Sequence, residues 1–101
     1  MHSALDIAED HPSFAGHFPE FPVLPGAVLL DETLQAIESA RGIDLTQWRI
    51  SSTKFLDVVR PRDKLVLAHD VERAGLIRFT VHAENRKVAS GTLSDAPRDS
   101  R

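Results

Sequence analysis

Residues 16–26 read GHFPEFPVLPG, and the apolar segment 27–40 follows them directly. One histidine, His17, lies in this stretch, and the stretch ends in a Pro-Gly pair. Prolines restrict the backbone here and disfavour helix, so an ordered loop is expected. No other part of the sequence combines this much backbone restriction with this much hydrophobicity. We therefore expect the rest of the chain to pack around the segment that follows the loop.

That segment has the pattern of a buried helix. Its apolar positions cover more than one face: Val28, Leu29, Leu30, Leu34, Ile37 and Ala40. The first turn is apolar all round, which predicts a helix covered on several sides. Gly42 is a good stop signal, because glycine readily adopts the left-handed conformation that ends many helices. The predicted helix, residues 27–41, would be about 22 Å long.

Outside the helix, the pattern predicts short strands separated by turns. The predicted strands are 4–8, 48–59, 64–73, 76–84 and 87–93, with turns at 60–63, 74–75 and 85–86. The clearest alternation places four side chains inward: Ile77, Phe79, Val81 and Ala83. In the strand before it, Leu65, Leu67 and Val71 share a face, and His69 falls on the same inward register.

The predicted architecture is α+β: a loop, a buried helix, then a meander of about four strands. A curved antiparallel sheet wrapped around one long central helix would bury one face of each element. The far side of that helix would remain open, and a second copy of the chain could cover it. We expect residues 1–94 to form a single domain and residues 95–101 a frayed tail.

The totals exclude several classes of protein. The chain has 101 residues, a net charge of −3 and no cysteine. The net charge gives no sign of a basic surface for nucleic acid. Without cysteine, there is no disulfide and no thiolate metal site. The N-terminus lacks a signal-peptide pattern, and no apolar run approaches the ~18 residues that span a bilayer. A cytoplasmic location, without membrane attachment, is the default expectation.

The loop and helix could together carry acid–base chemistry. His17 could act as a base and Asp31 as an acid, with Gln35 one turn further along the same helix face. The Gly26 N–H, at the positive end of the helix, could bind a developing negative charge. From spacing alone a non-catalytic interpretation is the more common one, in which the histidine is structural and the carboxylate is solvated. A metal site from His11, His17 and Asp31 lacks any ligand-spacing motif, so neither metal nor cofactor is expected.

The stretch 16–26 closely resembles the signature of the hot-dog-fold 3-hydroxyacyl-[acyl-carrier-protein] dehydratases. His17, Asp31 and Gln35 fall at the spacings of that family, and the similarity continues through Lys54-Phe55 and the turn 60–65. The sequence of residues 11–17 resembles that of the short aryl-polyene-type dehydratases. Three features depart from the usual pattern: Glu20 replaces a glycine, the acid is aspartate as in the isomerising branch, and the chain is short.

The resemblance implies a hot-dog fold and a homodimer with one continuous sheet, in which each site takes His17 from one subunit and Asp31 from the other. It implies a 3-hydroxyacyl thioester substrate on the phosphopantetheine arm of acyl carrier protein, dehydrated to a trans-2-enoyl thioester. Asp31 would be kept protonated by apolar surroundings. Acyl carrier protein is acidic, so Arg60, Arg62 and Lys64 are candidates for docking it, although such a cluster is more often merely solvated.

Two other functions remain open on the sequence. The same fold hosts thioester hydrolysis, so an acyl thioesterase is one alternative. A non-catalytic subunit that binds an acyl chain or completes a heterodimer with another dehydratase is the other. The loop of residues 16–26 favours dehydration over hydrolysis, and the presence of both His17 and Asp31 argues against a catalytically dead subunit.

Overall fold

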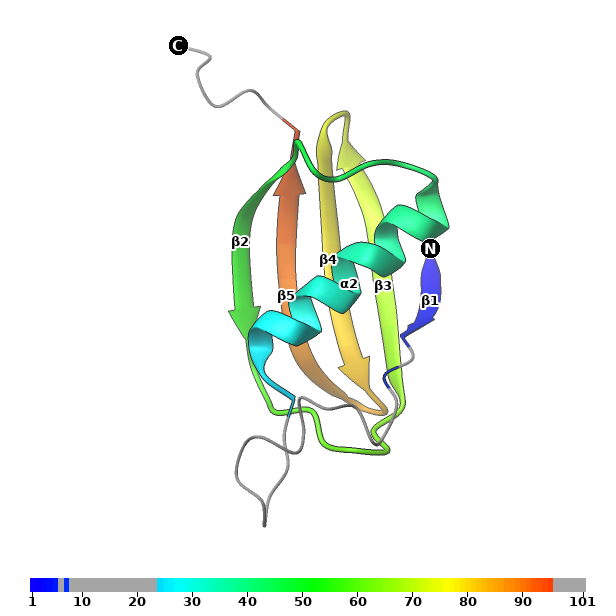
Figure 1. Cartoon of the computed structure of the whole chain (residues 1–101), viewed down its shortest axis with the longest axis vertical. Helices are drawn as coiled ribbons and strands as arrows, with labels where there is room; N and C mark the ends of the chain where they lie inside the picture. Colours follow the sequence, from blue (N-terminus) through cyan, green and yellow to red (C-terminus); the bar gives the residue numbers. More distant parts are fainter. Residues whose placement is uncertain (6, 8–23, 96–101) are drawn as a thin grey trace.

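The structure is a computed structural model, and it describes residues 1–5, 7 and 24–95. These residues form one helix and five strands (Figure 1). Their bounds are β1 His2–Leu5, α2 Gly26–Arg41, β2 Arg49–Phe55, β3 Leu65–Arg73, β4 Leu76–Ala83 and β5 Arg86–Ser94. The proline-rich loop and the predicted tail beyond residue 95 lie outside the described residues.

Helix α2 begins at Gly26, one residue before the predicted start, and ends at Arg41 as predicted. Pro25 precedes its first turn in an extended conformation, with φ −60° and ψ 145°. Gly42 closes it in the left-handed conformation, at φ 64° and ψ 37°, and donates its N–H to the Glu38 carbonyl. Arg41 lies in the last turn, where a cation interacts favourably with the negative end of the helix dipole. The backbone preferences of Pro25 and Gly42 therefore define the two ends of the helix.

The sheet is antiparallel, with the strand order β1-β3-β4-β5-β2. The predicted meander is therefore wrong at one point, because β2 pairs with β5 and not with β3. Two-residue turns join β3 to β4 and β4 to β5, so these three strands form one block with two free edges. Because β1 occupies the β3 edge, β2 takes the β5 edge. Residues 56–64, which we call the crossover segment, carry the chain from β2 to β3.

Helix α2 lies diagonally across one face of this sheet (Figure 1). The fold is the predicted α+β hot-dog arrangement. The buried apolar side chains come from the helix, the facing strands and the connections: Leu5, Leu24, Leu29, Ile37, Leu45, Val59, Leu65, Leu67, Ile77, Phe79, Val81, Ala83, Val88, Ala89 and Leu93. All four residues predicted to point inward from β4 are among them. On the helix itself only Leu29, Thr33 and Ile37 are buried, so in the single chain the helix is covered on one side only.

Several local predictions need correction. The first strand is His2–Leu5 and not 4–8, and the last turn is Glu84-Asn85, with the positive φ of 57° at Glu84. Strand β2 ends at Phe55, since the crossover segment leaves the ladder there. Val71 is exposed although it lies opposite buried Ile77, because it precedes a register shift at an end of β3 that no described residue covers. Among the described residues, no helix is long and apolar enough to cross a bilayer.

Candidate functional site

The start of α2 forms one wall of a pocket of about 220 Å³. Its lining is mostly apolar: Leu24, Gly26, Leu29, Phe55, Asp57, Val58 and Val59. The Pro25 carbonyl accepts hydrogen bonds from the N–H groups of Val28 and Leu29, both at 3.1 Å. No described residue accepts a hydrogen bond from the Gly26 N–H, which is one of the free donors at the positive end of the helix. An apolar pocket with a free amide at its wall suits a carbonyl oxygen on which negative charge develops.

At Gly26 an aromatic ring packs directly against the backbone of the helix start. A Cβ atom at residue 26 would lie 3.1 Å from Cζ of Phe55 and 3.2 Å from two further ring atoms. The Phe55 side chain is half exposed, so its ring covers the helix start without being enclosed by the chain's own core. Glycine therefore lets the ring and the backbone amide share one wall of the pocket.

Asp31 and Gln35 meet on the exposed face of α2. The Gln35 Nε2 donates a hydrogen bond of 2.9 Å to Oδ2 of Asp31, so the predicted contact one turn apart is present. Asp31 follows Leu29 by two positions, which places it about 200° round the helix from that buried pocket residue. Within one chain, the Asp31 carboxyl therefore points away from the pocket at the helix start. The apolar surroundings expected for this carboxyl are not supplied by the described residues of its own chain.

A second hollow, of about 490 Å³, runs between α2 and β1. It is lined by Ser3, Ala4, Leu5, Glu32, Gln35, Ala36, Ser39 and Ala40. Gln35 thus contacts Asp31 on one side and lines this hollow on the other. Glu32 is the carboxylate that faces it, so it is the next acid to consider if Asp31 proves dispensable.

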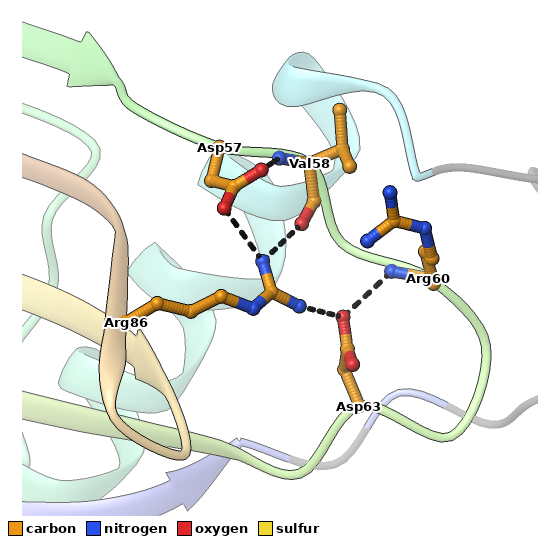
Figure 2. Close-up of polar contacts among 5 residues, drawn as sticks. All are labelled: Asp57, Val58, Arg60, Asp63 and Arg86. Carbon is orange, nitrogen blue, oxygen red and sulfur yellow. Dashed lines mark hydrogen bonds and ion pairs between the residues drawn. The ribbon is translucent and has the colours of Figure 1, made fainter.

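An ion-pair network that the sequence did not suggest holds the crossover segment (Figure 2). The Arg86 guanidinium donates to the Val58 carbonyl at 3.0 Å and lies 3.1 Å from Asp57 Oδ2 and 2.8 Å from Asp63 Oδ2. The Val58 N–H donates to Asp57 at 2.7 Å, and the Arg60 N–H donates to Asp63 at 2.8 Å. The Val58 N–H and, after it, the Arg86 guanidinium lower the pKa of Asp57.

A second network anchors the far end of α2. His69 is 1% exposed, and its Nδ1 accepts a hydrogen bond of 2.8 Å from Nε of Arg41. Nη2 of Arg41 also donates to the His69 carbonyl at 3.0 Å. Because Nδ1 accepts, the neutral ring carries its proton on Nε2, which has no partner among the described residues. Burial and then the Arg41 charge lower the pKa of His69, which favours the neutral ring. The predicted inward register of His69 is confirmed, since the residue is buried.

The remaining predicted site residues have different outcomes. His17 lies outside the described residues, as does Glu20. Arg60, Arg62 and Lys64 are exposed at the turn between β2 and β3, where Asp63 donates its N–H to the Arg60 carbonyl at 3.1 Å. Arg62 has the positive φ of that turn, 76°. The described residues contain no group of three or more acidic or histidine side chains placed to hold a metal ion.

Comparison with known proteins identifies the family of this chain. A family model described as ApeI-like, ApeI dehydratase, matches residues 1–92. The 3-hydroxyacyl-[acyl-carrier-protein] dehydratase FabZ of Polynucleobacter asymbioticus is 31% identical over 77% of this chain and 58% of its own length. FabZ of Streptococcus agalactiae serotype V is 31% identical over 90% of this chain and 73% of its own length. The chain thus spans less than two thirds of the first relative and about three quarters of the second.

Solved structures share the fold. The dehydratase heterocomplex ApeI:P from Xenorhabdus doucetiae has a TM-score of 0.71 at 24% identity, over 92% of this chain and 83% of that one. The F36A mutant of the fluoroacetyl-CoA-specific thioesterase FlK has a TM-score of 0.65 at 11% identity, over 92% of this chain and 84% of that one. The fold is the hot-dog fold, and the family model and the second relative place the chain in the dehydratase class. Within that class, the chain belongs to the ApeI-like dehydratase family.

Proposed function

We propose that this protein dehydrates 3-hydroxyacyl thioesters carried on the phosphopantetheine arm of acyl carrier protein. The C2–H bond and the C3–O bond break, a double bond forms between C2 and C3, and water leaves. The product is a trans-2-enoyl thioester. The atoms balance without an oxidant, a reductant or a cofactor.

Each candidate residue has one role in this reaction. Neutral His17 takes the proton from C2, and the Gly26 N–H donates a hydrogen bond to the thioester oxygen as enolate charge develops. Protonated Asp31 of a second chain gives its proton to the departing C3 hydroxyl. Gln35 donates to Oδ2 of Asp31, which leaves Oδ1 as the oxygen that holds and delivers the proton.

The observation that carries the proposal is the hydrogen bond between Gln35 and Asp31. A hydrogen bond between residues one turn apart stabilises the helix by itself, and here it also orients an exposed carboxyl that points away from its own chain's pocket. That orientation would serve the reaction when the carboxyl faces the pocket of a second chain. The dehydratase relatives and the Gly26 N–H, a free donor at the helix start, favour dehydration as the reaction of such a shared site.

Substitution of the two proton-transfer residues tests the proposed reaction. His17→Ala and Asp31→Asn should each lower hydration of a crotonyl thioester by at least about a hundredfold, because each removes one proton-transfer step. Circular dichroism and gel filtration should show the same fold and assembly as the wild type. Near-normal turnover by the Asp31→Asn variant would contradict the acid assignment and direct attention to Glu32.

Product analysis separates the alternative functions. With a 3-hydroxyacyl carrier substrate, mass spectrometry should show loss of water from the acyl group while the thioester stays intact. Release of the free thiol would instead identify an acyl thioesterase. If the chain alone leaves the substrate unchanged but gains activity with another dehydratase subunit, it is one half of a heterodimer.

We further propose that two copies join along β2 into a homodimer with shared sites. Strand β2 is at one edge of the sheet (Figure 1), and among the described strands it pairs with β5 alone. The outer backbone groups of an edge strand are a template for pairing with another chain. Ile50, Phe55 and Leu56, at or just beyond this edge, are 45%, 51% and 52% exposed. A second copy on this edge would cover those side chains and extend the sheet.

The docking of acyl carrier protein by Arg60, Arg62 and Lys64 stays a prediction, as does a cytoplasmic location. All three cations lie in or next to the crossover segment that forms a wall of the pocket at the helix start. Their position is therefore compatible with delivery of a tethered thioester to that pocket.

A further inference from the structure

We propose that Arg86 is a positioning residue for the pocket at the start of α2. The inference deepens the proposed function and rests on it where turnover is concerned. The polar contacts of Arg86 to described residues go to Asp57, Val58 and Asp63. Arg86 acts on the crossover segment, which supplies Asp57, Val58 and Val59 to the pocket wall.

The crossover segment needs such an anchor because it has no regular secondary structure between β2 and β3. At its start, the N–H of Leu56 donates to the Val88 carbonyl at 2.8 Å. Beyond that point, the Arg86 guanidinium bridges three separate acceptors of the segment: the Val58 carbonyl and the carboxylates of Asp57 and Asp63 (Figure 2). A planar guanidinium can make these contacts at once, whereas an ammonium group has a different donor geometry.

This network is more sheltered than an ordinary surface ion pair. The side chains of Arg86 and Asp63 are 31% and 22% exposed, and their contact is 2.8 Å long. Strand β5 begins at Arg86, so the side chain that carries the guanidinium extends from the hairpin of β4 and β5. The hairpin therefore holds the crossover segment at both Val58 and Asp63, on either side of Val59.

Val59 transmits the position to the helix start. Its carbonyl accepts the N–H of Leu24 at 2.8 Å, and its side chain is 2% exposed. Leu24 comes two residues before Gly26, which lines the pocket. Arg86 thus fixes Val59, Val59 fixes Leu24, and the backbone at the helix start follows.

The first test measures amide exchange, which needs no substrate. In the full-length chain, Arg86→Ala should speed hydrogen exchange of the Leu24 and Asp63 amides by at least about tenfold, because local opening no longer breaks the Arg86 contacts. The matched control is Arg78→Ala. Arg78 lies on the neighbouring strand β4 and makes a comparable paired contact with Glu72 at 2.8 Å, away from the crossover segment. Equal exchange of Leu24 in both variants would overturn the proposal.

The second test measures turnover of a crotonyl thioester. Arg86→Ala should raise KM about tenfold with a smaller change in kcat, because the displaced wall weakens binding of the substrate. Loss of folded enzyme would lower kcat alone, so the rise in KM separates positioning from general destabilisation. Arg78→Ala should stay within about twofold of the wild type in both constants. An unchanged KM in Arg86→Ala would overturn the role in the site.

Two further variants keep both tests decisive. Arg86→Lys should give intermediate exchange and KM values, since one ammonium cannot replace the forked contacts. If Arg86→Ala fails to fold, Asp63→Asn weakens the same network while keeping one acceptor, and it should shift both readouts in the same direction by less. A wild-type chain inactive on every thioester would contradict the proposed function, and the exchange measurement would still decide the positioning role.

Discussion

At the scale of single residues, two arginines organise the two ends of the helix. Arg41 holds the C-terminal end against β3 through His69, and Arg86 holds the crossover segment beside the N-terminal end. Both make several contacts to groups that are far away in the sequence. In each case the guanidinium donates hydrogen bonds to a backbone carbonyl as well as to side chains. An aliphatic side chain of similar length has no donors for these bonds.

His69 makes the stability of the fold depend on pH. Its pKa is lowered in the folded chain by burial and by Arg41, so the folded state favours the neutral ring. This contribution to stability is complete above the unfolded pKa of about 6.5 and is lost as pH falls from there toward the lowered folded value. We expect the wild type to lose more unfolding free energy between pH 7.5 and 5.5 than His69→Gln does. Urea denaturation at both pH values measures this, and parallel losses in the two proteins would contradict it.

At the scale of elements, the edge strand β2 differs from the strands in the sheet interior. Its side chains are mostly exposed, whereas β4 alternates between buried and exposed positions along its length. An edge strand with an apolar surface and free backbone groups is a hazard unless something covers it. Pairing with a second β2 would satisfy the backbone and the side chains together.

Placing a charge on this edge should separate the dimer. Ile50→Lys introduces two charges at a symmetric interface, one from each copy, so we expect the dimer dissociation constant to rise by at least about tenfold. Light scattering coupled to gel filtration measures the mass. Val66→Lys is the matched control, since Val66 is 44% exposed but lies on β3, away from this edge. A wild-type monomer, or dissociation by the control alone, would count against pairing along β2.

At the scale of the whole molecule, the pocket at the helix start and the Asp31 carboxyl face different directions. The helix itself imposes this, because Leu29 and Asp31 lie on opposite sides of it. One chain therefore offers an amide pocket on one side and an oriented carboxyl on the other. Two chains related by a twofold axis would form two complete sites from these halves.

Mixing inactive variants tests the shared site directly. When His17→Ala and Asp31→Asn chains are unfolded together and refolded, about half of the dimers should be mixed, each with one intact site. Hydration of a crotonyl thioester should therefore recover to about a quarter of the wild-type rate. Each variant refolded alone serves as the control and should stay inactive. No recovery despite mixed dimers would show that each site is built within one chain.

The sequence by itself determined the features that depend on neighbouring residues. Pro25 restricts the backbone and Gly42 readily adopts the left-handed conformation, so both ends of α2 could be predicted to within one residue. The alternation of β4 and the contact of Gln35 with Asp31 one turn apart could be predicted too. The role of His17 stays a prediction. These features follow from backbone dihedral preferences and from the periods of helix and strand, which are properties of short segments.

Only the tertiary structure decided which distant segments meet. The pairing of β2 with β5, the exposure of Val71, and the contacts of Arg86 and His69 all depend on residues far apart in the chain. Strand β2 pairs at the sheet edge that β1 leaves free. The crossover segment, which connects β2 to β3, therefore runs past Arg86. Periodicity describes which face of an element is apolar, but it contains no information about the neighbour that will cover it, because that neighbour is selected by the packing of the whole chain.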